Sequence, residues 1–142
     1  MSKALEYAKV AAANGEVPIG AVVVLNGEAI GCGQNRMEEL SSATAHAEML
    51  AINEAGHAIK NWRLDGATIY VSLEPCPMCM SAIKNSRISR VVFAASDTRT
   101  EANSFSSNTE SGLMEKESAE ILQNFFRNVR RIKNDSGNKG LL

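Results

Sequence analysis

The sequence predicts an α/β domain in which a mixed sheet carries helices on both faces. Apolar, β-branched runs of strand length alternate with segments of helical periodicity, after an opening stretch that has the pattern of a hairpin. The segment 68–95 is expected to fold as strand, helix, strand, and such a connection favours parallel pairing of its two strands. Strands that are separated by helices in this way give a sheet covered on both sides.

The opening strands follow a predicted helix over residues 2–13, where apolar residues recur at a loose helical spacing. Asn14-Gly15 ends this helix in the manner of a C-cap. A β-branched run then leads into Asn26-Gly27 and a second short apolar run. Because Asn-Gly tolerates the positive φ values of a two-residue turn, this stretch is expected to be a β-hairpin.

The rest of the chain adds a polar connection, two helices and a long loop. Residues 35–43 are polar and irregular, 45–59 are helical in pattern, and 96–111 form a polar loop with weak structure signals. The last helix is expected over 113–131, and the tail after about residue 134 is expected to fray. The buried stripe of the last helix is predicted to be Ile121, Leu122, Phe125, Phe126 and Val129.

The composition suits a single domain, 1–142, that needs no disulfide staples. Apolar residues make up 44% of the chain, and no apolar run approaches the ~20 residues that a membrane-spanning helix needs. The N-terminus lacks the basic head and long apolar centre of a signal peptide, so a cytoplasmic location is expected. In that compartment, three cysteines indicate metal binding or catalysis rather than a disulfide framework.

The net charge of −1 provides no global basic field for a nucleic acid. Such a partner would have to be held by a local patch, and the C-terminal segment offers one. Residues 125–142 contain one acidic residue, Asp135, and five basic residues: Arg127, Arg130, Arg131, Lys133 and Lys139. Two interpretations stay open: an RNA-binding surface, or a solvated helix end that suits the negative end of the helix dipole.

The motif Cys76-Pro77-Met78-Cys79 is expected at a helix start. Proline fits the first helical position because its missing N–H has no helical partner there, which makes Cys76 the N-cap and Cys79 the third helical residue. Both sulfurs would then lie near free amides and the positive end of the dipole, which favours the metal-binding thiolate form. Taken alone, the motif is either a redox pair or half of a zinc site.

The stretch TAHAEML, residues 44–50, supplies the rest of a metal site. Thr44 is expected to be the N-cap of its helix, which puts His46 in the first turn. One histidine and two cysteines can bind a tetrahedral ion, and three protein ligands leave its fourth position open for water, as in catalytic zinc sites. Glu48 is not committed to capping, because a capping box from Thr44 would need glutamate at position 47.

The order H-x-E followed by P-C-x-x-C is the signature of zinc-dependent nucleobase and nucleoside deaminases. Because two thiolates cancel the formal charge of zinc, we expect the metal to acidify its water less than an all-histidine site would. A nearby base then becomes necessary, and Glu48 is the candidate. It would take a proton from the attacking water, pass it to the ring nitrogen beside the attacked carbon, and later protonate departing ammonia.

Most of the chain resembles bacterial tRNA-specific adenosine deaminases. The resemblance lies in VPIGAVVV, GCGQNR, TAHAE, LEPCPMCMSAIKNSRISRVVF and FFR. It implies a three-layer α/β/α cytidine-deaminase-like fold with about five strands. It also implies attack on C6 of the wobble adenosine in a tRNA anticodon, giving inosine, by a homodimer. Each subunit would bind one zinc ion through His46, Cys76 and Cys79, with Glu48 as the proton shuttle.

The resemblance further implies contacts with the substrate. Asn35 would contact the nucleoside, although it could also be a simple turn residue, and Asp97 and Arg99 would lie on the substrate side. The last helix would help hold the tRNA anticodon loop through Phe126, Arg127, Arg130 and Arg131. The two phenylalanines of FFR are also candidates for the core.

Two segments depart from the family pattern. Ser42-Ala43-Thr44 stands where the family usually has Asp-Pro-Thr, and Glu101, Ala102 and Asn103 stand where it usually has glycine and small residues. The region 101–112 looks about a dozen residues short, and SSNTESGL, where the family has its final strand, is a poor strand former. These changes bear on RNA specificity more than on deamination.

Two other functions stay open. One is a deaminase of the same fold that acts on a free base or nucleoside, of the guanine or cytidine type. The other is a non-catalytic, zinc-stabilised RNA-binding protein, although a purely structural zinc site usually has four protein ligands. Three residues are expected outside the site: Cys32 as an apolar strand residue, His57 on a helix surface, and Trp62 in packing.

Overall fold

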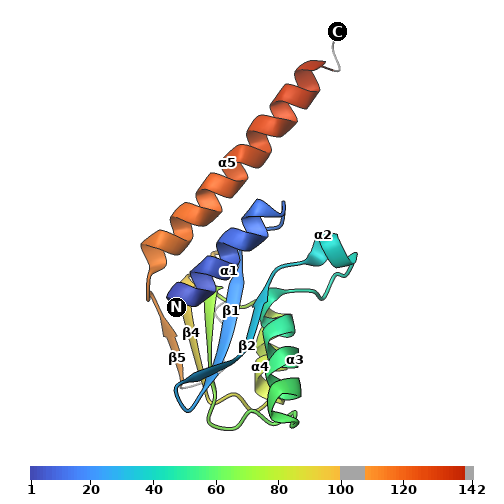
Figure 1. Ribbon diagram of the computed structural model, residues 1–142. Coiled ribbons are helices and arrows are strands. Elements are labelled where there is room, and N and C mark those ends of the chain that lie inside the picture. The colour runs from blue at the N-terminus through green and yellow to red at the C-terminus, as the bar shows by residue number, and fades with distance from the viewer. Residues whose placement is uncertain (100–107, 140–142) are drawn as a thin grey trace.

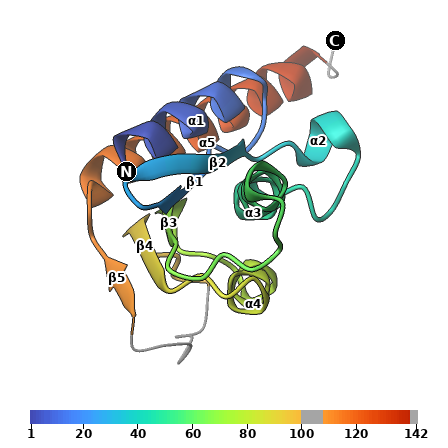
Figure 2. The same cartoon turned by 60° about the horizontal axis from the view of Figure 1, so that its bottom comes forward.

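A five-stranded mixed sheet lies between two layers of helices, which confirms the predicted fold class (Figure 2). The computed structural model describes residues 1–99 and 108–139, with side chains as far as residue 136. The strands are β1 (Gly20–Leu25), β2 (Glu28–Gln34), β3 (Thr68–Leu73), β4 (Arg90–Ala95) and β5 (Thr109–Ser111). Their order across the sheet is β2-β1-β3-β4-β5.

The predicted hairpin is present as β1 and β2, which pair antiparallel. Asn26 and Gly27 form its turn with φ values of 51° and 77°, in the left-handed region that Asn-Gly accepts. β1 also pairs antiparallel with β3, whereas β3 and β4 pair in parallel through the connecting helix α4 (Pro77–Asn85). The parallel pairing predicted for this unit is thus confirmed, and the chain leaves β3 directly into the cysteine motif.

The short strand β5 forms although its sequence is a poor strand former. It pairs in parallel with β4 at the edge of the sheet. Arg90 of β4 makes a bidentate ion pair with Glu110, with distances of 2.7 Å from Nη2 to Oε2 and 3.2 Å from Nε to Oε1. The carbonyl oxygen of Asn108 accepts a hydrogen bond from the N–H of Val91. Contacts with β4 thus outweigh local propensity, and a last strand is present.

Helices cover both faces of the sheet. α1 (Ser2–Ala13) and α5 (Glu115–Lys139) lie side by side on one face, and α3 (Ala47–Ile59) and α4 cover the other (Figures 1 and 2). The connection 35–43, predicted to be irregular, contains one helical turn, α2 (Met37–Leu40). None of the helices in the described part of the chain is long and apolar enough to cross a membrane.

The start of helix α5 is anchored on the sheet. Oγ of Ser118 donates a hydrogen bond to the buried carbonyl oxygen of Ser72 in β3. Oγ of Ser72 in turn accepts a hydrogen bond from the N–H of Gly20 at 3.0 Å. Farther on, α5 projects past the body of the protein (Figure 1). It continues to Lys139, beyond the point near residue 134 where fraying was expected, because a helix that is already nucleated extends at one hydrogen bond per residue.

The predicted apolar stripe of α5 is only partly buried. Ile121, Leu122, Phe125 and Val129 are half-buried, whereas Phe126 is 41% exposed. The rings of Phe125 and Phe126 meet edge to face, with centroids 5.4 Å apart. Since the distal part of the helix extends past the body, its stripe has less of the protein to pack against (Figure 1).

Helix α3 lies directly on β2 because the strand residues that face it are glycines. A Cβ on Gly31 would come within 2.2 Å of the carbonyl oxygen of Ala51, and one on Gly33 within 2.4 Å of that of Ala47. Both alanines have no exposed surface. Glycine facing alanine therefore sets the height of α3 above the sheet, and with it the position of the first residues of this helix.

Replacing Gly33 with alanine is expected to lower the free energy of unfolding by about 1–3 kcal/mol, because the new methyl group meets helix backbone that cannot rotate away. The start of α3, next to His46, should shift most. Gly56→Ala is the control, because its Cβ has its nearest contact at 3.4 Å and lies in a helix that alanine favours. Urea unfolding checks the prediction; an unchanged stability for Gly33→Ala would contradict it.

Candidate active site

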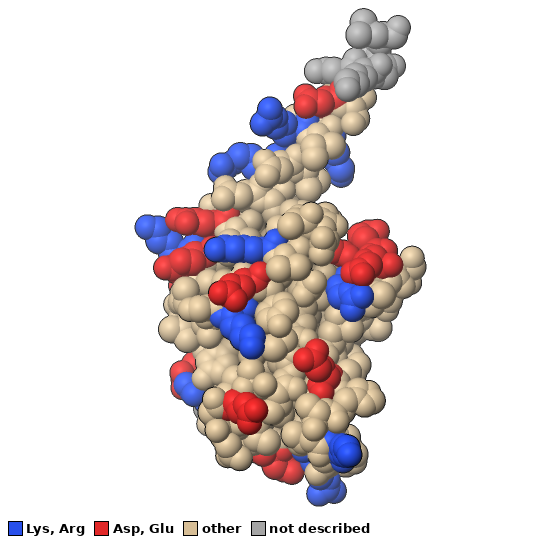
Figure 3. Space-filling view, viewed as in Figure 1, with Lys and Arg blue, Asp and Glu red and all other residues tan. Residues whose placement is uncertain are grey.

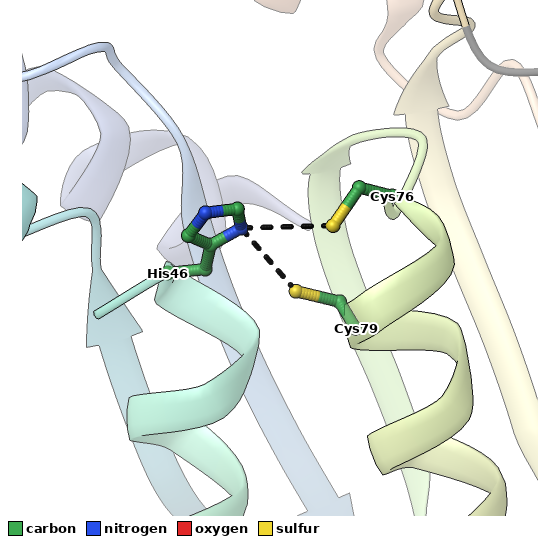
Figure 4. Close-up of side chains that lie close together, drawn as sticks. All are labelled: His46, Cys76 and Cys79. Atoms are coloured by element: carbon green, nitrogen blue, oxygen red, sulfur yellow. Dashed lines mark hydrogen bonds between the residues drawn. The ribbon is translucent and has the colours of Figure 1, made fainter. Parts of the chain in front are cut away.

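Helices α3 and α4 begin close together, and their starts carry the histidine and the two cysteines (Figure 4). His46 is itself the N-cap of α3, with φ −76° and ψ 152°, so the prediction that Thr44 caps this helix is wrong. The reason is a contact from elsewhere in the chain. The N–H of Arg36 donates to the carbonyl oxygen of Ala45 at 3.0 Å, which favours an extended chain up to His46.

The predicted position of the cysteine motif at a helix start is confirmed, whereas the expectation that this position favours thiolate is not, because burial raises the pKa of the Cys79 thiol. Cys76 is the N-cap of α4, Pro77 is its first residue and Cys79 its third. Within the described residues, the side chains of His46 and Cys76 make no capping bond to their own helices. Both side chains turn toward the gap between the two helices, and Cys79 points to the same place from the first turn of α4 (Figure 4).

The three side chains fit a tetrahedral zinc ion. Nδ1 of His46 lies 3.7 Å from Sγ of Cys76 and 3.5 Å from Sγ of Cys79, and the three atoms lie within 4.8 Å of one another. Zinc–nitrogen and zinc–sulfur bonds of about 2.05 and 2.3 Å at tetrahedral angles place N and S about 3.6 Å apart. Because the observed distances match this spacing, the cluster could hold zinc without rearranging.

Glu48 lies beside this cluster with a buried carboxyl group. It is the second residue of α3 and is 4% exposed. No other described residue gives its Oε1 a hydrogen bond. Burial raises the pKa of the Glu48 carboxyl above its ordinary value. Since buried polar atoms in folded proteins nearly always have a partner, this oxygen is open to one that the described residues do not supply, such as water or a substrate.

The electrostatics of the cluster favour a bound cation. Burial raises the pKa of the Cys79 thiol, and the acidic groups of Glu48 and Cys76 raise it further. Burial also lowers the pKa of His46, which favours the neutral form of the imidazole that binds metal. A divalent cation at this point would stabilise the thiolates that burial disfavours. Donor set, distances and charge therefore all suit zinc.

Asn35 follows β2 directly and is 4% exposed. Its N–H donates to the carbonyl oxygen of Ile19, and its Oδ1 accepts a hydrogen bond from the N–H of Met37 at 3.2 Å. Asn35 is therefore a turn residue, one of the two roles considered for it. A contact with the substrate stays a prediction, and it would fall to the NH2 group of the side chain.

Asp97 and Arg99 lie just after the carboxyl end of β4, which is next to the carboxyl end of β3, where the cysteine motif begins. The N–H of Glu74 donates to the carbonyl oxygen of Ala95 at 2.8 Å, which ties the two strand ends together. The Arg99 guanidinium binds the Asp97 carboxylate through two 3.0 Å contacts and holds the pKa of that carboxyl below its ordinary value. Their contact with a substrate stays a prediction. Outside the described residues lie Glu101, Ala102 and Asn103.

The predicted RNA-binding residues are not part of this cluster. They lie on α5, across the sheet from α3 and α4 (Figure 2). Lys and Arg side chains gather along the projecting part of this helix (Figure 3). The four residues, all exposed, are Phe126, Arg127, Arg130 and Arg131. They form a second, separate surface, and RNA contact there stays a prediction.

Sequence reasoning missed two features. Glu16 is buried and accepts hydrogen bonds from the backbone of α2; no motif around it gave a signal.

Trp62, expected to pack, is 59% exposed, with the Arg63 guanidinium 5.0 Å from its ring. Trp62 borders a groove of about 780 Å³ between α3 and α4. His57 is exposed on α3, as expected.

Several known deaminases are similar to this chain. The model of a family described as MafB19-like deaminase matches residues 1–130. A tRNA-specific adenosine deaminase of Bacillus subtilis is 45% identical, over 94% of this chain and 90% of the relative. A structure from a study of A-to-I editing by tRNA:A34 deaminases at the wobble position is 43% identical, with a TM-score of 0.81 over 86% of this chain and 97% of that one. A guanine deaminase structure from Bacillus subtilis is 37% identical, with a TM-score of 0.67 over 73% of this chain and 67% of that one.

Proposed function

Because this chain belongs to the tRNA-specific adenosine deaminase family, we propose that it hydrolyses adenosine to inosine and ammonia at the wobble position of a tRNA anticodon. The observation that carries the proposal is the convergence of His46, Cys76 and Cys79 on one point, beside the buried carboxyl of Glu48. Three protein ligands leave a tetrahedral ion one open corner, which distinguishes a catalytic from a structural zinc site.

Each of these side chains then has a role. His46, Cys76 and Cys79 would hold one zinc ion per subunit, and the chemistry that the ion would supply is activation of water at neutral pH. Glu48 accepts a proton from the water that attacks C6 of the adenine ring and delivers it to the adjacent ring nitrogen. It then takes the second proton of that water, from the new hydroxyl on C6, and gives it to the C6 amino group, which leaves as ammonia while the C6 carbonyl of inosine forms. Oε1 of Glu48 supports this role, because it has no hydrogen-bond partner among the described residues and can bond to the attacking water.

The target base has to leave its neighbours before it can react. In a single-stranded anticodon loop an adenosine can be splayed out into an enzyme pocket at small cost. The NH2 group of Asn35 and the Asp97–Arg99 pair are the proposed contacts with this nucleoside. The Asp97–Arg99 pair follows the end of β4. The hydrogen bond between Glu74 and Ala95 holds this end of β4 next to the start of the cysteine motif.

A free-base deaminase of the guanine type is less well supported. The guanine deaminase is less similar to this chain, at 37% over 73% of the chain, than the tRNA-specific deaminase, at 45% over 94%. An inosine assay on an anticodon stem-loop, run beside free adenosine, cytidine and guanine, separates the two functions. We expect inosine in the RNA and little turnover of the free compounds; turnover of a free base without inosine in the RNA would overturn the proposal.

The basic surface of α5 is the proposed RNA-binding surface. Replacing Arg130 and Arg131 with alanine should weaken binding of the stem-loop and reduce the slope of log K against log salt by about 1.4, because each phosphate that a side chain neutralises in a single strand contributes ~0.7. Lys3→Ala/Arg87→Ala is the matched control, since both side chains are exposed and neither lies on α5 or in the groove beside Trp62. Fluorescence anisotropy over a salt series measures the slope, and an unchanged slope for the α5 variant would exclude this surface.

We also propose that the enzyme is a cytoplasmic homodimer. The exposed Trp62 and the groove beside it, between α3 and α4, support a protein contact on this face. Sedimentation equilibrium should give about twice the mass of one chain, as expected for a two-fold dimer. A single-chain mass at all working concentrations would remove the dimer from the proposal.

A further inference from the structure

The turn after α1 fixes the position of Glu16. Its N–H donates to the carbonyl oxygen of Ala11 at 2.9 Å, and the N–H of Gly15 donates to that of Ala12 at 3.1 Å, which together make a Schellman motif. Gly15 supplies the left-handed residue that the motif needs, with φ 77°. The backbone at Glu16 is therefore held in place, and the residue is only 2% exposed.

The carboxylate of Glu16 caps the one-turn helix α2. Oε1 accepts a hydrogen bond from the N–H of Glu38 at 2.9 Å, and Oε2 accepts one from the N–H of Glu39 at 3.0 Å. Amides in the first turn of a helix have no partner within the helix. The N-cap residue, Arg36, makes no capping bond from its side chain in the described structure. Glu16 therefore does for α2 what a capping residue usually does.

The same segment holds the side chain of Asn35. Met37, the first residue of α2, donates its N–H to Oδ1 of Asn35, and the next two amides along the chain are those that Glu16 accepts. Arg36 is held by two contacts to Glu39, of 2.8 and 3.0 Å. Glu16 thus anchors the middle of the connection that runs from Asn35 toward the start of α3.

We propose that Glu16 is a positioning residue, whose carboxylate holds α2 in place and thereby fixes the direction of the Asn35 amide. The inference rests on the proposed function, in which Asn35 contacts the nucleoside. Glutamine cannot replace Glu16, because an amide has one acceptor oxygen and its NH2 group would face an N–H donor. The metal cluster should be spared, because the close contacts of Gly31 and Gly33 with α3 still hold this helix, which begins at His46, on β2.

The test compares Glu16→Gln with Glu28→Gln, an exposed glutamate in the hairpin. In Glu16→Gln, amide hydrogen exchange at residues 38 and 39 should speed up about tenfold or more, because these amides lose a charge-assisted hydrogen bond. The NMR signals of the Asn35 side-chain NH2 group should move. KM for the stem-loop should rise about tenfold, with kcat changed less and the zinc content unchanged. Glu28→Gln should match the parent in every measurement.

The outcomes separate this inference from the proposed function. Unchanged exchange at residues 38 and 39, or unmoved Asn35 signals, would overturn the role of Glu16, as would an unchanged KM in an enzyme whose Asn35 signals have moved. A parent protein that makes no inosine would overturn the proposed function, while exchange and the Asn35 signals still decide the positioning. If Glu16→Gln does not fold, Glu16→Asp, which is too short to reach both amides, gives the same readouts.

Discussion

Replacing Glu48 with glutamine is expected to lower kcat for inosine formation by about 10²–10⁴-fold while the zinc content stays the same. Glutamine has nearly the same shape and should occupy the buried site at the start of α3, but it can neither accept nor deliver the proton. Because Oε1 of Glu48 has no hydrogen-bond partner among the described residues, the substitution breaks no bond of the fold through that atom. Single-turnover assays on a stem-loop, with metal analysis of the same sample, measure both effects.

The control for this variant is Glu54→Gln, an exposed glutamate on the same helix. It should keep the activity of the parent, since its side chain lies on the solvent side of α3. The same experiment tests the alternative function, a non-catalytic zinc protein that only binds RNA. For such a protein, Glu48→Gln would leave function unchanged, and a fully active Glu48→Gln enzyme would refute the proton-shuttle role.

Removing the metal is expected to destabilise the protein strongly. A ligand present at about 1,000 times its Kd stabilises the folded state by about 4 kcal/mol, and each kcal/mol shifts Tm by about 2–4 °C for a chain of this size, so chelation should lower Tm by roughly 10 °C. The buried thiol of Cys79, with Glu48 and Cys76 close to it, is the physical reason, because these groups lose the cation between them. Differential scanning calorimetry with and without chelator measures the shift.

The chain offers a matched pair of cysteines for this experiment. Cys79→Ser should abolish the response of Tm to zinc and chelator, because the variant loses one of three ligands. Cys32→Ser should keep the full response, since Cys32 lies in β2 and is not part of the cluster. Equal responses from the two variants would contradict the assignment of the metal ligands.

Features that depend on local sequence were predictable. The hairpin turn follows from Asn26-Gly27, because few other pairs accept two positive φ values. The start of α4 follows from the proline at its first position. The two halves of the metal site could be joined because their residue types and their places at helix starts suit one tetrahedral ion. In each case a few neighbouring residues contain the physical cause.

Features that depend on distant contacts were not predictable. The start of α3 was misplaced because the hydrogen bond between Arg36 and Ala45 keeps the chain extended up to His46. The strand β5 forms through its backbone pairing with β4, to which an exposed ion pair adds, against its own propensity. Glu16 gave no signal, because the amides that it caps lie 22 and 23 positions farther along the chain. Such contacts exist only once the sheet has brought the segments together.

Metal analysis of carefully purified protein tests the central claim most directly. If His46, Cys76 and Cys79 hold a catalytic ion, the protein should contain about one zinc per chain, and apoprotein should take up one equivalent on reconstitution. A preparation that is folded, contains no stoichiometric transition metal and takes up none when zinc is added would contradict the claim. The roles assigned to Glu48 and to the open corner of the site would then have no basis.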